Sequence, residues 1–268
     1  MRDTHTRAAI ATAIRALHTP QFMPRFTALL RCVAAFDNLI VIAYCGEQRP
    51  EALYREYVDP VVYLPMDSEY LQGAYLLDPF YLQHRAGRDA GVERLADIAP
   101  DRFRRSEYYR SYYRQTTLID EVAVFARVSP GVTLTACLGK DRSSATRFLP
   151  REINALKRYE ATLSALMETH WRDYQPAPGR PKQVLPLSRR LQHVLWREHG
   201  IQLSPRQAEV ALYILRGHSS RSIARALGIS AQTVKVFRRQ LYSRCAVSSQ
   251  AQLFALLLPL LTRLTDAY

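Results

Sequence analysis

The clearest pattern along the chain is a pair of short amphipathic segments over residues 219–245. Their apolar residues recur at helical spacing and predict two helices, because positions three or four apart share one face of a helix. Between them Gly228 gives the backbone freedom that a tight turn needs. Ser230 is placed to cap the second helix by accepting from its free N–H groups. The pattern therefore predicts a helix-turn-helix, with Val234, Phe237 and Leu241 as the buried stripe of the second helix.

The outer face of that second helix is basic. It carries Gln232, Lys235, Arg238 and Arg239, and residues 219–245 contain no acidic residue. A helix with such a face has the shape that enters the major groove of DNA. An ordinary solvated helix pair is the alternative interpretation.

Neighbouring segments complete a small helical domain. Ser204 to Gln207 form a capping box that opens a helix ending at Gly217. A further helix is expected over 188–199. Ser248 or Ser249 caps a last helix over 250–261, whose broad apolar stripe suits either simple core packing or pairing with a second copy.

The N-terminal part mixes helical and strand patterns. Helices are expected over 5–18, 21–34 and 149–174, and strands over 38–45, 61–64, 121–128 and 131–138, the last two forming a hairpin. Residues 52–58 suit a helix or a strand, and residues 67–115 are mostly helical and rich in tyrosine. The expected fold class is α+β: an antiparallel sheet with flanking helices, then an all-α helix-turn-helix domain.

Composition divides the chain at a proline-rich stretch. Residues 175–187 hold four prolines and no periodicity, which is typical of a linker. Residues 188–268 then form the helix-turn-helix domain, and residues 1–174 a sensing and dimerisation domain. Residues 175–268 carry 14 Lys and Arg against 3 Asp and Glu, whereas residues 1–174 carry 23 against 21. A basic module attached to a neutral domain is typical of nucleic-acid binding.

Other classes of protein lack support in the sequence. The four cysteines have no metal-ligand spacing, and the settings of Cys32, Cys45 and Cys137 indicate core positions in a reducing cytoplasm. No signal peptide is expected, because the N-terminal MRDTHTRAAIATAIRAL has no uninterrupted apolar stretch. No membrane span is expected, because the longest apolar run, 253–261, is too short. No catalytic motif is found. We therefore expect no enzyme, no metal and no cofactor.

The C-terminal module resembles the LuxR/GerE-type DNA-binding domain of bacterial transcription regulators. The matching pieces are Leu203-Ser204-Pro205-Arg206, Gly217, Ile223-Ala224, Leu227-Gly228-Ile229-Ser230, Thr233-Val234-Lys235 and Val247-Ser248. The family often has Glu where this chain has Gln207 and Ser222, and usually His where it has Phe237. The resemblance implies a dimer on two-fold related half-sites, with RNA polymerase as a candidate partner. It implies base or adjacent phosphate contacts for Lys235, Val236 and Arg239, and backbone contacts for Thr233 and Arg238.

The N-terminal part resembles sensors of such regulators. The stretch LLDPFY, followed by SEYYRSYYRQTTLIDEVAVFARV, is similar to GAF/PAS-like sensor domains. Tyr75-Leu76-Leu77-Asp78-Pro79 is similar to the Tyr and Asp-Pro part of acyl-homoserine-lactone sensors. Those sensors place a tryptophan in the pocket, whereas Trp171 and Trp196 follow the sensor core here. A phosphorylated receiver is not expected, because the strand–helix alternation of that fold is absent.

Eleven tyrosines lie between Tyr44 and Tyr113, interleaved with acidic residues. An aromatic box with a carboxylate suits a cationic or amine-bearing ligand. Half-buried core tyrosines with wetted hydroxyls are the alternative. The candidate ligand-binding residues are Tyr70, Tyr75, Asp78, Tyr109, Tyr113 and Asp120.

The expected function is a cytoplasmic bacterial transcription regulator that senses a small molecule and binds double-stranded operator DNA as a homodimer. Two alternatives remain: a receptor for an acyl-homoserine lactone or a related autoinducer, and a ligand-independent architectural DNA-binding protein.

Overall fold

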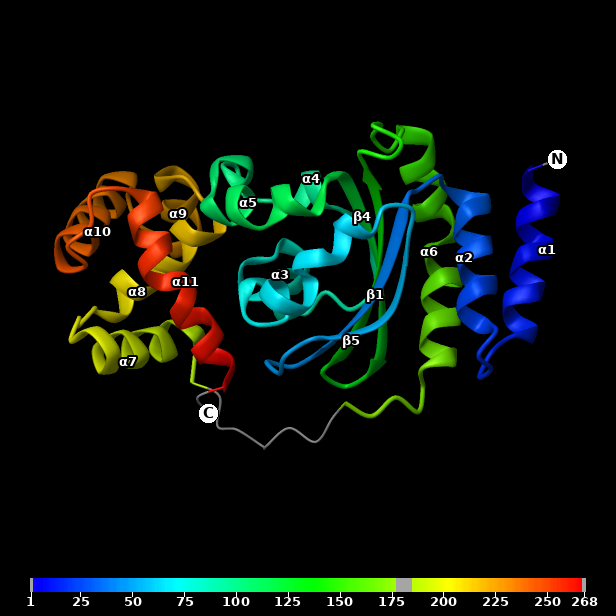
Figure 1. The fold of residues 1–268 in the computed structure, drawn as a ribbon, viewed down its shortest axis with the longest axis horizontal. Helices are drawn as coiled ribbons and strands as arrows, with labels where there is room; N and C mark the ends of the chain where they lie inside the picture. The colour runs from blue at the N-terminus through cyan, green and yellow to red at the C-terminus, as the bar shows by residue number, and fades with distance from the viewer. Residues whose placement is uncertain (1, 177–184, 267–268) are drawn as a thin grey trace. The chain divides into compact units, whose positions relative to one another are not determined.

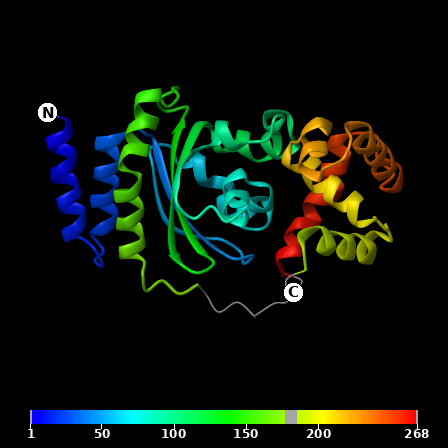
Figure 2. The same cartoon turned by 180° about the vertical axis from the view of Figure 1, so that it is seen from behind.

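The computed structural model describes residues 2–176 and 185–266, and Figures 1 and 2 show its ribbon from opposite sides. The chain forms two compact units. The sheet unit comprises Met1–Val62, Gln83–Ile98 and Thr117–Gly179, and the helical unit comprises Tyr63–Leu82, Ala99–Thr116 and Arg180–Tyr268. Two tyrosine-rich segments thus belong to the same unit as the C-terminal helices. The linker expected at 175–187 lies mostly outside the described residues.

The sheet unit is built on five antiparallel strands in the order β2-β1-β5-β4-β3. Their bounds are β1 Asn38–Cys45, β2 Glu51–Tyr57, β3 Gly91–Arg94, β4 Leu118–Ser129 and β5 Val132–Asp141. Every residue of β1 and β5 is buried. Strands buried on both faces have continuous apolar runs rather than alternation, which is the pattern that predicted β1. The predicted hairpin is confirmed as β4 and β5.

One side of the sheet is covered by α1 (Arg2–Arg15), α2 (Phe22–Val33) and α6 (Pro150–His170), as both ribbon views show. α6 packs on β3 and β4, α2 contacts α6, and α1 packs on α2. The core between these layers is aliphatic and aromatic. Its fully buried members include Phe26, Leu30, Leu39, Val41, Val122, Val124, Leu134, Leu138, Leu156 and Leu163.

Where β1 meets β5, the backbone of Gly139 lies against Asn38. A Cβ at Gly139 would lie 2.1 Å from Asn38 Oδ1 and 2.6 Å from Leu118 Cδ2, so no larger residue fits without movement. The Asn38 side chain donates to Asp141 Oδ2 at 2.7 Å. Glycine at this register position thus leaves room for a buried polar bond between the strands.

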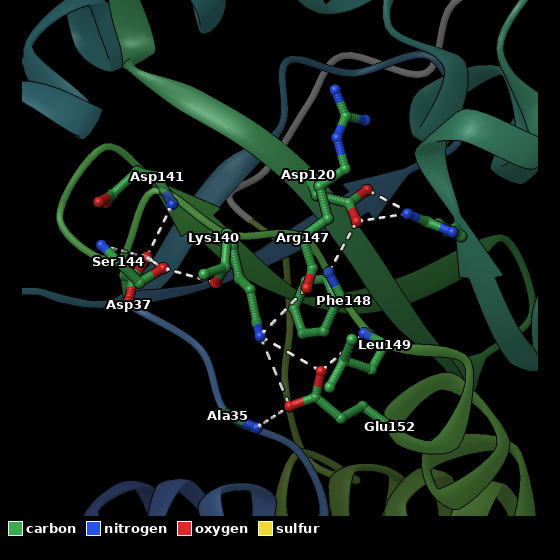
Figure 3. A network of polar contacts seen from close by, with 12 residues as sticks. Ala35, Asp37, Asp120, Lys140, Asp141, Ser144, Arg147, Phe148, Leu149 and Glu152 are labelled. Carbon is green, nitrogen blue, oxygen red and sulfur yellow. Dashed lines mark hydrogen bonds and ion pairs between the residues drawn. The ribbon is translucent and has the colours of Figure 1, made fainter.

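A polar network joins the end of β5 to the start of α6 (Figure 3). Lys140 is buried, and its Nζ lies 3.2 Å from Glu152 Oε2. Glu152 also accepts from the backbone N–H of Leu149 at 2.7 Å and of Ala35 at 3.1 Å. The carboxylate therefore caps the free N–H groups where α6 begins, beside Pro150 at its first turn.

Several expectations for the N-terminal part need correction. The strand expected at 61–64 is wrong: Pro60–Tyr63 is a 3₁₀-helix, since Asp59 Oδ1 accepts from the Val61 N–H at 3.0 Å and starts a turn there. Residues 52–58 are largely the strand β2. The helical reading of 67–115 missed β3, which is only four residues long. Cys32 is exposed rather than a core residue, whereas Cys45 and Cys137 are buried.

The helical unit contains the C-terminal helices and short helical pieces of the tyrosine-rich segments. The helices are α7 Leu187–His199, α8 Pro205–Arg216, α9 Ser220–Leu227, α10 Ala231–Arg244 and α11 Gln250–Asp266. The pieces are η2 Met66–Tyr70, η3 Ala74–Leu77, η4 Phe103–Arg105, α5 Glu107–Ser111 and η5 Tyr113–Thr116. α3 (Pro79–Arg85) spans the boundary between the units, and α4 (Leu95–Ile98) belongs to the sheet unit. The predicted α+β class is confirmed.

The apolar stripe of α11 is covered by its own chain. Leu253, Leu257 and Leu261 are fully buried. α11 packs on α7 and α8, and also on η3 and α5 of the tyrosine-rich segments. Core packing therefore accounts for much of the stripe, while Leu256 and Leu258 stay half-buried.

Candidate nucleic-acid interface and ligand-binding cluster

The turn between α9 and α10 is fixed by local hydrogen bonds. α9 begins at Ser219, whose Oγ accepts from the Ser222 N–H at 3.1 Å. It ends at Gly228, which has a left-handed backbone with φ of +64°. α10 begins at Ser230, whose Oγ accepts from the Thr233 N–H at 3.0 Å. These contacts confirm the predicted turn at Gly228 and the predicted cap at Ser230, whereas the cap at Ser219 was not predicted.

The inner face of α10 holds the helix on α8 and α9. Val234 and Leu241 are fully buried, and Phe237 is half-buried. On α8 the predicted capping box is present, since Ser204 Oγ accepts from the Gln207 N–H and the Gln207 side chain accepts from the Ser204 N–H. α10 is therefore held on α8 and α9 by one face, while side chains on its opposite face are exposed.

The six residues predicted to contact DNA all lie on α10. Gln232, Thr233, Lys235 and Arg239 are exposed. Val236 and Arg238 are half-buried, and the Arg238 guanidinium stacks over the Tyr242 ring at 5.9 Å. A guanidinium held by an aromatic ring has less rotamer freedom to lose on binding a phosphate.

A connected group of aromatic rings, here called the aromatic cluster, fills the tyrosine-rich part of the helical unit. Its members are Tyr70, Tyr75, Tyr81, Phe103, Tyr108, Tyr109, Tyr112 and Tyr113, with ring centroids 4.9–6.3 Å apart along the chain of contacts. Tyr70 contacts both Tyr75 and Tyr112, and Phe103 contacts three tyrosine rings edge-on or tilted. Such offset and edge contacts are the favoured geometries of aromatic pairs.

Asp78 places a carboxyl group in the aromatic cluster. It is 8% exposed, accepts a short hydrogen bond from the Tyr70 hydroxyl, and accepts from the Phe80 N–H at 2.8 Å. Burial raises the pKa of Asp78 to about 6, and the two hydrogen bonds oppose that change. The structure thus brings the predicted residues Tyr70, Tyr75 and Asp78 together.

Tyr109 and Tyr113 stack on each other at 5.3 Å and meet the cluster through Phe103. The neighbouring pair, Tyr108 and Tyr112, is the more deeply buried, at 1% and 5% exposure. The i, i+4 spacing showed that two faces carry tyrosines, but it did not show which face is buried.

Asp120 belongs to the sheet unit, whereas the other five predicted ligand residues belong to the helical unit. Its Oδ1 and Oδ2 accept from Nε and Nη2 of Arg94 at 3.1 and 2.6 Å, and Oδ2 also accepts from the Phe148 N–H at 2.9 Å. Figure 3 shows this carboxylate between β4 and the segment that leads into α6. Its contacts describe a structural role, and its place in a ligand site stays a prediction.

His84 is a buried polar residue that the sequence did not single out. In the sheet unit its ring stacks on Tyr44 at 5.6 Å, and its Nδ1 and Nε2 lie 3.0 Å from Thr133 Oγ1 and 3.2 Å from the Gly46 carbonyl. Burial lowers the pKa of His84. A lone histidine has no local spacing signal, so only the fold reveals this site.

The described residues show neither a cluster of metal ligands nor a membrane-spanning helix. No group of three or more His, Cys, Asp or Glu residues there is arranged to hold a metal ion. No helix in that part of the chain is long and apolar enough to cross a membrane.

Comparison with known proteins agrees with this geometry. Residues 201–257 match the luxR family of bacterial regulatory proteins. Over 187 residues the chain is 31% identical to an HTH-type transcriptional regulator of the exeN 3′ region of Aeromonas salmonicida, covering 68% of this chain and 93% of that protein.

Solved structures are also similar. The LBD domain of VqsR from Pseudomonas aeruginosa matches with 26% identity and a TM-score of 0.53, over 63% of this chain and 98% of that one. CepR2 of Burkholderia cenocepacia, an N-acylhomoserine lactone dependent LuxR family transcription factor, matches with 14% identity and a TM-score of 0.47, over 64% and 96%.

Together with these matches, the basic helix α10 and the sheet unit identify a DNA-binding transcriptional regulator, which is not a class of enzyme. The chain belongs to the LuxR family.

Proposed function

We propose that the chain is a ligand-responsive regulator in the cytoplasm that binds operator DNA as a homodimer through α10. In this proposal residues 188–268 bind DNA, residues 1–174 sense a small molecule, and RNA polymerase is a further partner. Lys235, Val236 and Arg239 reach base edges or adjacent phosphates. Gln232, Thr233 and Arg238 hold the helix on the DNA backbone.

The observation that carries the sensing part is the contact between the aromatic cluster and the start of the helix-turn-helix. Beside Phe103, the Arg102 N–H donates to the Gly217 carbonyl at 3.0 Å, and Asp101 Oδ1 accepts from the Ser219 N–H at 2.9 Å. A Cβ at Gly217 would lie 2.9 Å from Phe103 Cα. Because Ser219 caps α9, a displacement of the aromatic cluster would displace the N-terminus of α9, where the DNA-binding helix pair begins.

The ligand chemistry follows from Asp78. With a pKa of about 6, the carboxyl is mostly ionised at neutral pH. An amine or amide N–H of a ligand could replace the Tyr70 hydroxyl as the donor to Asp78. The Asp78 carboxylate would then be its acceptor, and the surrounding aromatic rings would contact the rest of the ligand. This supports an amine or amide-bearing effector. The amide of an acyl-homoserine lactone is one such group, so a receptor for such a lactone is the second candidate.

The test uses the full chain. Thermal unfolding is followed with a panel of amines and acyl lactones, because a ligand that binds the folded state raises the midpoint. Each hit is then added to fluorescence anisotropy titrations of an operator selected from random DNA. We expect a hit to change the DNA dissociation constant, and Asp78→Asn to blunt that response. Asp97→Asn, at an exposed acid of the sheet unit, is the matched control.

Two results would count against the proposal. An equal ligand response in Asp78→Asn removes Asp78 from the site. A panel without any effect on the midpoint or on DNA binding favours a ligand-independent architectural protein.

A further inference from the structure

A pocket lies among the C-terminal helices α7, α8 and α9. It has a volume of about 390 Å³. One wall is a stripe of α8, formed by Arg206, Glu209, Leu212, Tyr213 and Arg216. The other walls are Leu187 and Ser188 at the start of α7, and Ala226 and Leu227 at the end of α9. α7, α8 and α9 thus line one open pocket.

Arg216 is the unusual member of this pocket. Its Nε is buried without a hydrogen-bond partner, and no ion pair joins its guanidinium to a described residue. Burial lowers the pKa of Arg216 to about 10, and the nearby Tyr213 and Tyr81 offset only part of that effect. The side chain as a whole is half-buried. A cation that is partly withdrawn from water and has no counter-charge is unfavourable, so proteins commonly pair it.

The nearby described carboxylates are already engaged. Glu209 pairs with Arg206 at 2.8 Å, and Asp101 accepts from Ser219. The proline-rich stretch before α7, residues 175–187, contains no acidic residue. The positive charge of Arg216 therefore lacks a counter-charge among these groups.

The start of α7 adds to this positive potential. The helix spans thirteen residues, and its first turn has neither a side-chain cap nor an acidic residue. Its first N–H groups have no acceptor within the helix, and the helix dipole favours an anion there. Leu187, Leu212 and Leu227 make the rest of the lining apolar.

We propose that this pocket binds a small acidic molecule, with a carboxylate or phosphate group at Arg216 and the α7 N-terminus, and a short apolar part against the leucines. This would be a second effector site, and it does not rest on the function proposed above. A bound anion would tie α7 to α8 and α9, the helices that support the recognition helix.

The experiment measures thermal unfolding of the full chain in low-chloride buffer, with inorganic phosphate, citrate or butyrate added. Sodium chloride at equal ionic strength is the reference. At about ten times its dissociation constant, a bound anion should raise the midpoint by about 3 °C or more. Arg216→Met should abolish that rise, and Arg221→Met, at an exposed arginine of α9, should keep it. Phosphate and the two carboxylates separate the two ligand chemistries.

A second readout separates a ligand site from a structural arginine. Without added anion, Arg216→Met should unfold at the same temperature as the wild type or higher, because it removes an uncompensated charge. A lower midpoint would show that Arg216 is paired within the chain, and would overturn the proposal. The proposal would also fail if an anion raised the unfolding midpoint equally in the wild type and in Arg216→Met. It would fail likewise if DNA, and none of the small anions, raised the midpoint in a way that depends on Arg216. If Arg216→Met does not fold, Arg216→Gln is read in the same way.

Discussion

Replacing Asp78 by asparagine tests whether the ionised carboxylate, buried in the aromatic cluster, lowers the free energy of unfolding. The carboxyl is buried, and its pKa is raised from an ordinary value of 3.8 to about 6. Each pKa unit corresponds to about 1.36 kcal/mol, so keeping Asp78 ionised in the folded chain costs about 3 kcal/mol.

The sign of the pH dependence follows from the direction of that change. The folded chain holds the Asp78 proton more tightly than the unfolded chain does. Well below pH 3.8 both states are protonated and the cost is absent. As the pH rises from about 4 to about 6, the unfolded carboxyl ionises first, so the free energy of unfolding falls by about 3 kcal/mol through this group.

Asparagine removes the charge and keeps the hydrogen bonds. Its oxygen can accept from the Phe80 N–H, and its NH₂ can donate to the Tyr70 hydroxyl, which turns to accept. Asp78→Asn should therefore be more stable than the wild type at pH 7 by up to about 3 kcal/mol, with the difference vanishing near pH 4.

The assay is urea unfolding of both proteins from pH 4 to pH 8, with the difference in unfolding free energy plotted against pH. Other groups titrate in the same range, but they cancel in the difference. Tyr70→Phe is the companion variant: it removes one stabilising donor and should steepen the loss of stability as the pH rises. A difference between Asp78→Asn and wild type that does not change with pH would refute the reasoning.

Three further predictions concern the DNA-binding helix and the sheet. Lys235→Ala and Arg239→Ala should each weaken operator binding and, where the side chain reads a base, reduce discrimination by about 1–3 kcal/mol; unchanged anisotropy titrations for both would reject the assigned face. Gly139→Ala should destabilise the sheet unit by about 1–3 kcal/mol, because its Cβ would meet Asn38, and an unaltered urea midpoint would argue against the strand register. Ser230→Ala should cost about 1 kcal/mol through the lost cap, measured in the same way, and Ser230→Thr should restore most of it.

The sequence predicted the elements whose signals are local. The α9–α10 pair has its turn and the cap of α10 within a few residues, so Gly228 and Ser230 could be assigned before the fold was known. β1 was predicted because burial on both faces produces one apolar run. β2 remained ambiguous because all seven of its residues are exposed or half-buried, and pairing with β1 decides its conformation.

The candidate sites depend on contacts between distant residues, and these have no local pattern. Nothing within residues 99–116 indicates that this segment packs with the C-terminal helices. Arg216 resembles any helix-terminal arginine in the sequence, and only the surrounding helices leave it without a counter-charge. Asp120 was chosen because it follows the tyrosine-rich stretch, yet Arg94 and the Phe148 N–H engage its carboxylate.

The shared unit of tyrosine-rich segments and C-terminal helices has a consequence for building chimeric regulators. Exchange of DNA-binding modules is usually planned at a proline-rich boundary such as residues 175–187. Here such a cut would leave Asp101 and Phe103 against a foreign turn in place of Gly217 and Ser219. A graft that keeps its response should carry residues 99–106 along with the transplanted helices, or choose a donor with glycine at the matching turn.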